Sequence, residues 1–389
     1  KTYWQQRDYN KFTKLLDEHV PTISDEKLIS LSPKKNDKIK IGFLSSHINK
    51  SHSVTFFFKT ICASYNKKDF ELYLFLNNKI EDESVKHIQK QIDGTFNISN
   101  MSDTDAINFI RNKNIDIAFD LMGLTSSNRI TLFKNRVSPI QISWIGYCNT
   151  IGIKNMDYLI ADPNLIYKNE IDQYSEKVLF LPNIWNCHSG FEFPRQEHHA
   201  PVFKNNYITF GSFNNFNKIN SLVVKTWSNI LKKIPNSNLI IKSPTKKDID
   251  YLENLFDINK VKESVSFLSP EKEFINHLNL YNKIDIALDT FPWNGVTTSF
   301  ESIWMGVPVL TLKGYNFNSR CGESINRNIN MEELIAIDED DYIKKAVNLA
   351  TNQDYLRSIR KKIYNDAIIS PLFNTDKFSK DFFNLLKKI

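Results

Sequence analysis

The sequence predicts an α/β fold, and three observations support this prediction. Short apolar runs alternate with amphipathic stretches of helical length along most of the chain, which is typical of a mainly parallel sheet covered by helices. The alternation stops in one irregular stretch with two prolines, residues 183–206, and then starts again. With 389 residues, 41% of them hydrophobic and 24% charged, the chain is long enough for two cores. We therefore expect two α/β domains in tandem.

The first half of the chain is expected to contain short strands that are nearly all apolar. They are rich in Ile, Phe, Tyr and Leu, and turn-forming or amphipathic segments separate them. The expected strands are residues 38–46, 70–76, 115–122, 140–146, 157–162 and 177–182.

The second half repeats this pattern. The expected strands are residues 207–213, 238–244, 264–270, 284–290 and 308–312, and the expected helices are 219–234, 246–258 and 272–282. At the two ends, residues 1–36 are expected to be helical to about Val20 and then a polar linker, and residues 340–389 to form two or three closing helices. The predicted division is an N-terminal helical segment and linker (1–36), a first Rossmann-like domain (37–200) and a second with the closing helices (201–389).

Composition argues against several classes of protein. The 50 basic and 44 acidic residues give a net charge of +6, but the lysines are scattered as singles and pairs, which is typical of solvated helix faces rather than a nucleic-acid surface. The four cysteines have no CxxC spacing, so we expect a reduced, cytoplasmic protein without a zinc site. Because no apolar run reaches about 18 residues, we expect no membrane span. The oligomeric state stays unknown.

The few glycines indicate where ligands could bind. Of the 11 glycines, five (Gly42, Gly123, Gly146, Gly211 and Gly295) fall in or just beyond expected strands. Open α/β sheets bind ligands at this rim. The glycines form neither GxGxxG nor GxxxxGK[ST], so the dinucleotide fingerprint and the P-loop are absent.

The stretch DTFPWNGVTTSFESIW, residues 289–304, places Gly295, Thr297 and Thr298 between an expected strand and an expected helix. Amides at a helix N-terminus bind phosphate, and the two hydroxyls could add hydrogen bonds. An equally acceptable interpretation is that Thr297 only caps the helix, with Glu301 one turn further on. Glu301 could also reach a ribose hydroxyl. The local sequence leaves both interpretations open.

Three other segments carry candidate chemistry. Lys218, at the end of GSFNNFNK, could place a point charge beside a diphosphate. His47 and His52 lie in the loop after the first strand, and histidine, which titrates near neutrality, is a natural base for a hydroxyl nucleophile. His277 could stack on a flat base. Taken alone, a residue of each of these kinds is more often an ordinary structural or surface residue.

Together, and in this order, these segments resemble the catalytic region of the O-linked N-acetylglucosamine transferases, glycosyltransferase family 41. The resemblance runs from about residue 38 to 378 and includes IGFLSSHINKSHSVTFF, FGSFNNFNKI and DIALDTFPWNGVTTSFESIWMGVPVLTL. It implies a GT-B fold, in which two Rossmann-like domains face each other across a cleft. It also implies that the second domain binds the UDP-sugar and that no metal or cofactor is needed.

The resemblance further implies roles for residues of the second domain. Lys218 would neutralise the departing diphosphate. Thr297 and Thr298, after Gly295, would donate hydrogen bonds to its phosphates. Glu301 takes the place of the acidic residue that holds the ribose hydroxyls.

The remaining implied roles concern the base, the sugar and the acceptor. Asn215 would contact the nucleotide and His277 would pack on uracil, while Gly146 and Tyr147 would line the sugar pocket. His52 keeps the register of the family's histidine and is our candidate base.

Departures from the family affect the acceptor side most. The segment that should hold an aspartate proposed for proton transfer reads Ser46-His47-Ile48, and the arginine often found three residues after the uracil histidine is Leu280. No array of tetratricopeptide repeats, which in the family presents acceptor proteins, is evident.

The sequence therefore predicts an inverting, metal-independent glycosyltransferase that moves N-acetylglucosamine from UDP-GlcNAc to Ser or Thr of proteins. One alternative is a UDP-glucose or other hexose donor, or an Asn acceptor as in the N-glycosylating branch. The other is a nucleotide-sugar binding protein without turnover, which the missing aspartate would explain.

Overall fold

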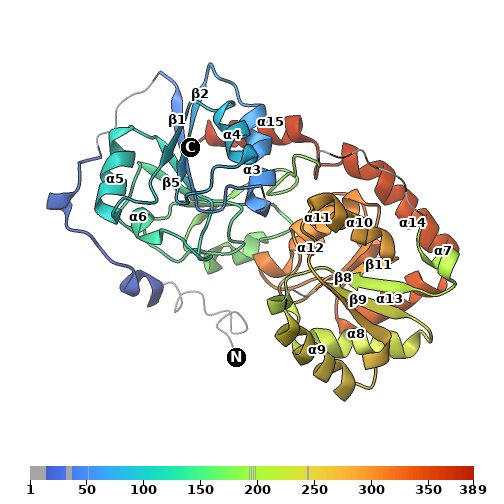
Figure 1. Ribbon diagram of the computed structural model, residues 1–389. Helices are drawn as coiled ribbons and strands as arrows, with labels where there is room; N and C mark the ends of the chain where they lie inside the picture. Colours follow the sequence, from blue (N-terminus) through green and yellow to red (C-terminus); the bar gives the residue numbers. More distant parts are fainter. Residues whose placement is uncertain are drawn as a thin grey trace. The chain divides into compact units, whose positions relative to one another are not determined.

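Two compact units make up the chain. The computed structural model describes residues 15–31, 37–50, 52–191, 193, 195, 197, 199–242 and 245–389. Unit 1 comprises Lys1–Ser189 and Thr375–Ile389, and unit 2 comprises Gly190–Asn374. Each unit is a parallel sheet covered by helices (Figure 1). This confirms the predicted pair of Rossmann-like domains.

Unit 1 contains a seven-stranded sheet of order β3-β2-β1-β4-β5-β6-β7, in which all neighbouring strands are parallel. Its strands are β1 (Ile39–Ser45), β2 (Phe70–Leu76), β3 (Gly94–Asn97), β4 (Ile117–Asp120), β5 (Ile140–Ser143), β6 (Tyr158–Ala161) and β7 (Lys177–Phe180). Its helices are η1 (Asp25–Lys27), α3 (Ser53–Ala63), α4 (Glu83–Gln89), α5 (Asp103–Asn112), α6 (Ile130–Lys134), η2 (Lys168–Gln173) and α15 (Thr375–Leu386).

The two faces of this sheet are packed differently. Alternate residues of a strand point to opposite faces, so Phe43 and Leu44 enter different cores. Leu44 belongs to a mainly aliphatic core under α5 and α6. On the other face the Phe43 and Phe58 rings are 4.9 Å apart, and Phe382 of α15 lies 4.7 Å from Trp144. Helices α3 and α15 therefore close an aromatic core.

Unit 2 contains a six-stranded sheet of order β10-β9-β8-β11-β12-β13. Its strands are β8 (Thr209–Ser212), β9 (Asn238–Lys242), β10 (Val265–Leu268), β11 (Ile286–Leu288), β12 (Val309–Leu312) and β13 (Ile335–Ala336). Its α-helices are α7 (Val202–Asn205), α8 (Ser221–Lys233), α9 (Lys246–Ile258), α10 (Phe274–Asn279), α11 (Thr297–Trp304), α12 (Cys321–Arg327), α13 (Glu339–Thr351) and α14 (Gln353–Asp366). Short 3₁₀ turns are η3 (Phe216–Lys218), η4 (Lys262–Ser264), η5 (Leu280–Lys283), η6 (Phe317–Ser319), η7 (Glu332–Leu334) and η8 (Ala367–Ile369). Figure 1 shows α8, α9 and α13 on one face of this sheet and α10, α11 and α12 on the other.

Both sheets have the strand order 3-2-1-4-5-6, with a seventh strand added in unit 1. In such sheets the order reverses between the first and fourth strands, and ligands bind outside the carboxyl ends at that point. The loops in question follow β1 and β4 in unit 1 and β8 and β11 in unit 2. These loops contain His47, His52, Lys218 and Gly295.

The observed units differ from the predicted domain boundaries. The division falls at Ser189, not at residue 200, and α15 belongs to unit 1 rather than to the second domain. The physical reason is that α15 packs on α3, where Ser379 Oγ donates to Thr60 O at 2.9 Å. Helical residues 15–19 agree with the predicted N-terminal helix. The rest of that prediction (1–14), part of the linker (32–36) and the end of the expected strand at 243–244 lie outside the described residues.

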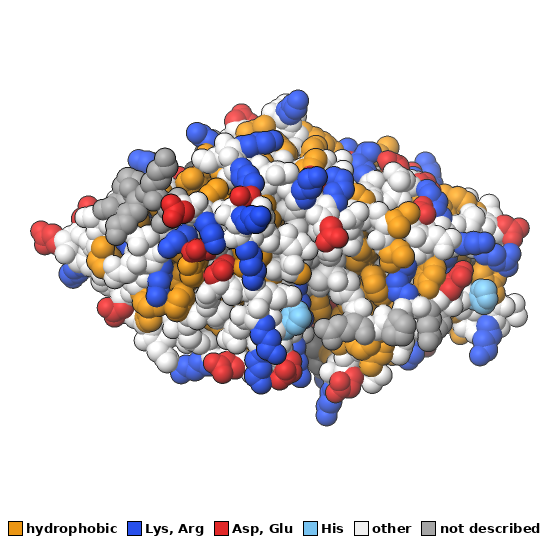
Figure 2. Space-filling model, turned by 90° about the horizontal axis from the view of Figure 1, so that it is seen from above, with side chains coloured by type: hydrophobic (Ala, Val, Ile, Leu, Met, Phe, Trp, Pro, Cys, Tyr) orange, Lys and Arg blue, Asp and Glu red, His pale blue; other side chains and the backbone are white. Residues whose placement is uncertain are grey.

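The surface charge, the cysteines and the helix lengths of the structure can be compared with the sequence predictions. On the face seen in Figure 2, basic and acidic side chains are intermixed, as the scattered lysines predicted. All four cysteines are free thiols. In the described ranges, no helix combines the length and the apolar character that a membrane crossing requires.

Candidate functional site

A buried aspartate organises the loop that follows β11 in unit 2. Asp289 Oδ1 accepts hydrogen bonds from Gly295 N at 2.6 Å and Thr290 N at 2.9 Å, and Oδ2 accepts from Thr311 Oγ1 at 2.8 Å. Burial raises the pKa of Asp289 to about 6, against the effect of these hydrogen bonds. The carboxyl group thereby fixes the turn that leads into α11. The sequence analysis did not identify it, although an acidic residue directly after a buried strand was a usable signal.

Gly295 is required by the close packing of this turn. A Cβ at this position would lie 2.6 Å from Thr298 Oγ1 and 2.8 Å from Asn214 Oδ1, which is closer than real contacts allow. Thr298 Oγ1 in turn donates to Asn214 Oδ1 at 3.0 Å. The sequence did not predict this contact of Asn214; the residue expected at the site was its neighbour Asn215.

Helix α11 begins without a side-chain cap. Its first residue is Thr297, the N-cap position is Val296, and no side-chain hydrogen bond caps it. The interpretation of Thr297 as an ordinary N-cap is therefore wrong. No carbonyl in the described part of the chain accepts from the backbone N–H of Thr297 or Thr298. These two N–H groups and the partly exposed Thr297 hydroxyl form a local anion-binding geometry at a helix N-terminus.

Lys218 lies next to this turn. It ends η3, its Nζ donates to Asn294 O at 2.7 Å, and the Nζ lies 5.6 Å from the centre of the Trp293 ring. The Lys218 ammonium group is thus fixed at the carbonyl of Asn294, the residue that precedes Gly295. Asn215 is exposed, and its side chain accepts from Asn217 N at 3.0 Å to cap η3. The structure places Asn215 beside the site but directs its oxygen to the turn.

A second, buried cluster lies against α11. His277 Nε2 is 2.9 Å from Glu301 Oε2, and Tyr281 OH is 2.8 Å from the same oxygen and 3.1 Å from Thr298 O. Lys242 Nζ is 3.1 Å from His277 Nδ1. His277 and Glu301 are only 8% and 4% exposed, so neither is a surface residue. Tyr281 follows His277 by four positions, a spacing that could have revealed it.

In unit 1 the two histidines after β1 stack on each other. The rings of His47 and His52 are 4.2 Å apart and inclined by 12°. His52 is the N-cap of α3, where Nδ1 accepts from Val54 N at 3.3 Å, and His47 Nε2 lies 3.2 Å from Ser126 O. Burial lowers the pKa of both rings, and the pKa of His52 falls to about 4. The expectation of a group titrating near neutrality is therefore corrected: both rings are neutral at pH 7.

Gly146 and Tyr147 belong to a tight contact between the loops after β4 and β5. A Cβ on Gly146 would lie 1.9 Å from Leu121 O. Gly123 has a φ of +56°, and a Cβ there would lie 2.2 Å from Tyr147 Cβ. Backbone packing alone explains both glycines. The role of Gly146 and Tyr147 in a sugar pocket stays a prediction.

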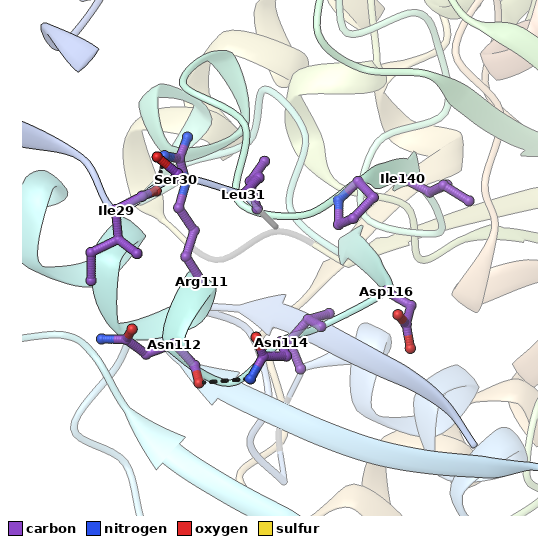
Figure 3. A pocket seen from close by; sticks show the side chains of 10 residues that line it. Ile29, Ser30, Leu31, Arg111, Asn112, Asn114, Asp116 and Ile140 are labelled. Carbon is purple, nitrogen blue, oxygen red and sulfur yellow. Dashed lines mark hydrogen bonds between the residues drawn. The ribbon is translucent and has the colours of Figure 1, made fainter. Parts of the chain in front are cut away.

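A separate pocket of about 360 Å³ lies at the opposite edge of the unit 1 sheet, near the amino ends of β4 and β5. Figure 3 shows Arg111 between Ile29 and the start of β5. Its guanidinium donates to the carbonyls of Ile29, Asn135 and Arg136, so it fixes the N-terminal segment against α5. None of the predicted site residues lines this pocket.

Metal ligands are not gathered anywhere in the described ranges. No group of three or more His, Cys, Asp or Glu side chains there could hold a metal ion. In unit 2, Lys218 and the free N–H groups at the N-terminus of α11 could meet an anion.

Comparisons with known proteins agree on one family. The profile described as glycosyl transferase family 41 matches residues 10–191 and 194–382. A probable UDP-N-acetylglucosamine–peptide N-acetylglucosaminyltransferase SPINDLY from Solanum lycopersicum is 29% identical over 401 residues, which is 100% of this chain and 42% of the relative. A probable UDP-N-acetylglucosamine–peptide N-acetylglucosaminyltransferase SPINDLY from Eustoma exaltatum subsp. russellianum is 33% identical over 276 residues. The aligned region covers 70% of this chain and 30% of the relative. The chain thus spans about two fifths or less of these relatives.

Solved structures show the same fold. A mutant O-GlcNAc transferase from Thermobaculum terrenum superimposes with a TM-score of 0.90 at 24% identity, covering 98% of this chain and 74% of that chain. A sucrose-phosphate synthase from Thermosynechococcus elongatus gives a TM-score of 0.60 at 10% identity, with 90% and 99% of the two chains covered.

Proposed function

Because this chain belongs to glycosyl transferase family 41, we propose that it transfers a sugar from a UDP donor to a protein side chain, with N-acetylglucosamine as the sugar and Ser or Thr as the acceptor. The observation that carries the proposal is the arrangement in unit 2 of Lys218 beside the uncapped N-terminus of α11. The names of the relatives support the donor and the acceptor class.

The diphosphate of the donor is proposed to bind at Thr297, Thr298 and Lys218. Two N–H groups, the Thr297 hydroxyl and one ammonium can stabilise the charge that grows on the departing diphosphate, in the way that a cation does elsewhere. This supports a metal-independent reaction. Tyr281 links Thr298 O to Glu301, and we assign the nucleoside to the side of His277 and Glu301.

The proposed reaction is one displacement. The acceptor oxygen forms a bond to the anomeric carbon while the bond from that carbon to the diphosphate oxygen breaks, and attack on the opposite face inverts the configuration. The electron pair leaves with the diphosphate. The hydroxyl proton must leave as well, and we assign it to His52.

The tautomer of His52 limits this role. Since Nδ1 accepts from Val54 N, the neutral ring carries its proton on Nε2. To act as a base, the ring must release this contact, which at 3.3 Å is long and so is worth about 1 kcal/mol or less. With a pKa of about 4, His52 is also a weak base, which suits a proton that departs late.

The test uses purified protein, an extract of the source cell as acceptor and either UDP-GlcNAc or UDP-glucose as donor. We expect intact-mass spectrometry to show addition of N-acetylhexosamine, with release of UDP, and both about 10²- to 10³-fold slower with Lys218→Ala. Addition of hexose, or addition on Asn, would replace the donor or the acceptor in the proposal. UDP binding without any UDP release would show a binding protein, and tighter binding of GDP or ADP than of UDP would contradict the assigned nucleotide.

A further inference from the structure

Lys242 is the one cation in contact with the buried cluster of His277, Tyr281 and Glu301 among the described residues. It ends β9, a strand that contributes none of the residues discussed for the reaction, and its Nζ lies 3.1 Å from His277 Nδ1. The contacts continue from His277 Nε2 to Glu301 Oε2 at 2.9 Å and from there to Tyr281 OH at 2.8 Å. Both nitrogens of the imidazole are therefore engaged.

These contacts are consistent with one arrangement of protons. An ammonium group has three donors and no acceptor, so a charged Lys242 requires a lone pair on His277 Nδ1. The imidazole proton is then on Nε2, from which it donates to the Glu301 carboxylate. If a neutral Lys242 accepted from Nδ1–H of a neutral ring, the Nε2 lone pair would face the Glu301 oxygen at 2.9 Å, two acceptors in contact. A doubly protonated ring would turn its Nδ1–H toward the charged Lys242, two donors in contact.

The surroundings of Lys242 fit this arrangement. Burial lowers the pKa of Lys242, and the negative charge of Glu301 acts in the opposite direction. Leu280, at the position where the sequence comparison led us to expect an arginine, is 4% exposed and apolar. The positive charge next to His277 therefore comes from β9 and not from the turn that contains Leu280.

We propose that Lys242 is a positioning residue of the nucleoside site: it holds His277 in the Nε2–H tautomer and thereby orients both the imidazole plane and the Glu301 carboxylate before the nucleotide binds. This rests on the proposed function only in its reference to the nucleotide. The tautomer itself is a property of the protein without ligand.

The first experiment measures the tautomer. In protein labelled with ¹⁵N-histidine, long-range ¹H–¹⁵N correlation spectra report the protonation of each ring nitrogen, and His277→Gln identifies the His277 signals among the eight histidines. We expect protonated Nε2 and unprotonated Nδ1 in the wild type. Lys242→Met leaves only the Glu301 contact to favour Nε2–H, so the Nδ1 resonance should shift and a fraction of the Nδ1–H form should become detectable. Lys242→Arg and Lys242→Gln, which keep a donor, should retain the Nε2–H form. An Nδ1–H tautomer in the wild type, or an unchanged spectrum in Lys242→Met, overturns the proposal.

The second experiment measures UDP affinity by calorimetry. We expect Lys242→Met to raise the Kd about 5- to 30-fold, less than the loss of a direct charged hydrogen bond because Lys242 acts through His277 and Glu301, and Lys242→Arg to restore most of the affinity. Lys247→Met, on exposed α9, is the matched control with no expected change. Normal affinity in Lys242→Met with an altered tautomer contradicts the positioning role. If the wild type shows the expected tautomer but binds no UDP, the proposed function fails and the tautomer assignment stands.

Discussion

The two units share a buried aspartate at the same place in the sheet, but the groups beside it differ between the units. In each sheet a buried aspartate stands at the carboxyl end of the fourth strand: Asp120 ends β4, and Asp289 directly follows β11. Burial raises the pKa of both to about 6, and both accept backbone N–H groups of the loop that follows. The aspartate therefore fixes the loop at the switch point, whatever that loop then carries.

What lies next to the fixed loops differs in charge. In unit 2 the surroundings include an ammonium, a carboxylate and uncapped helix amides. In unit 1 they include two stacked imidazoles whose pKa values are lowered by burial. The comparison teaches that the same backbone arrangement can carry charged groups and free helix amides in one unit and uncharged imidazoles in the other.

The largest effect on activity should come from removing the Lys218 ammonium group of unit 2. Lys218→Ala should lower turnover about 10²- to 10³-fold, the usual cost of one preorganised charge stabiliser, with a smaller effect on UDP affinity. Initial rates of UDP release and calorimetry measure the two effects. Lys225→Ala, on the exposed side of α8, is the control. Equal losses in rate and affinity would mean that Lys218 only binds.

Removing the imidazole of unit 1 should have the next largest effect. His52→Ala should lower kcat toward the lower end of about 10- to 10³-fold, because a base with a pKa of about 4 is weak, and UDP affinity should hardly change. His52→Asn separates chemistry from capping, since asparagine is a good N-cap but no base. We expect it to keep the melting temperature and lose the same activity. Near-normal kcat in His52→Asn would make His52 only the cap of α3.

The pH dependence of kcat provides a second test of His52 as the base. Because the pKa of His52 is lowered to about 4, the neutral base persists above that value and is lost as the pH falls through it. The acidic limb of kcat should therefore lie near pH 4, below the ordinary imidazole value of about 6.5. Rate measurements from pH 3.5 to about 8 on stable protein, with His47→Gln to remove the neighbouring ring, would check this. A limb near 6.5 that disappears in His52→Asn would show that the ring is more solvated than its burial indicates.

Glu301→Ala should weaken UDP binding by about 1 to 3 kcal/mol, because it removes a charged hydrogen-bond acceptor proposed for the ribose, and should hardly affect turnover at saturating donor. The same change leaves His277 Nε2 and Tyr281 OH without their partner, so the melting temperature should fall as well. Glu301→Gln, which still accepts hydrogen bonds, is the control for folding. If Glu301→Ala melts early yet binds UDP normally, the residue is only structural.

The smallest effect is expected from chelation. Excess EDTA should leave UDP affinity unchanged, because the proposed phosphate site consists of protein groups alone. Calorimetry with and without EDTA decides this. Loss of binding that Mg²⁺ or Mn²⁺ restores would show that a metal completes the site.

Most of the fold could be predicted because buried parallel strands are continuous apolar runs. The expected strand at 70–76 and helix at 246–258 match β2 and α9 to the residue. Two strands were missed. Gly94–Asn97 contains Gly, Thr and Asn around a single Phe, and Ile335–Ala336 is two residues long, so neither gives a periodic signal. The amphipathic pattern of α15 predicted a helix but could not say which unit it covers.

The site was predicted in part for a similar reason. Lys218, Thr297, Thr298 and Glu301 belong to contiguous segments, and their sequence neighbours indicated them. Lys242 and Asp289 function through contacts with residues distant in the chain, Lys242 with His277 and Asp289 with Thr311. A single sequence does not display such pairs. The lowered pKa of His52 depends on burial and on the neighbouring His47 ring, and neither effect is visible in a loop sequence.

The attachment of α15 to unit 1 has a consequence for the order of folding. As the chain is synthesised from its amino end, residues 190–374 must all emerge before α15 can dock on α3. Until then the aromatic face that holds Phe119 and Trp144 lacks Phe378 and Phe382. Unit 2 consists of one continuous segment of the chain. It can therefore complete its core before unit 1 does, although most of unit 1 is synthesised earlier. A nascent chain of this protein thus finishes its second domain before its first, and the exposed aromatic face is its point of risk for aggregation.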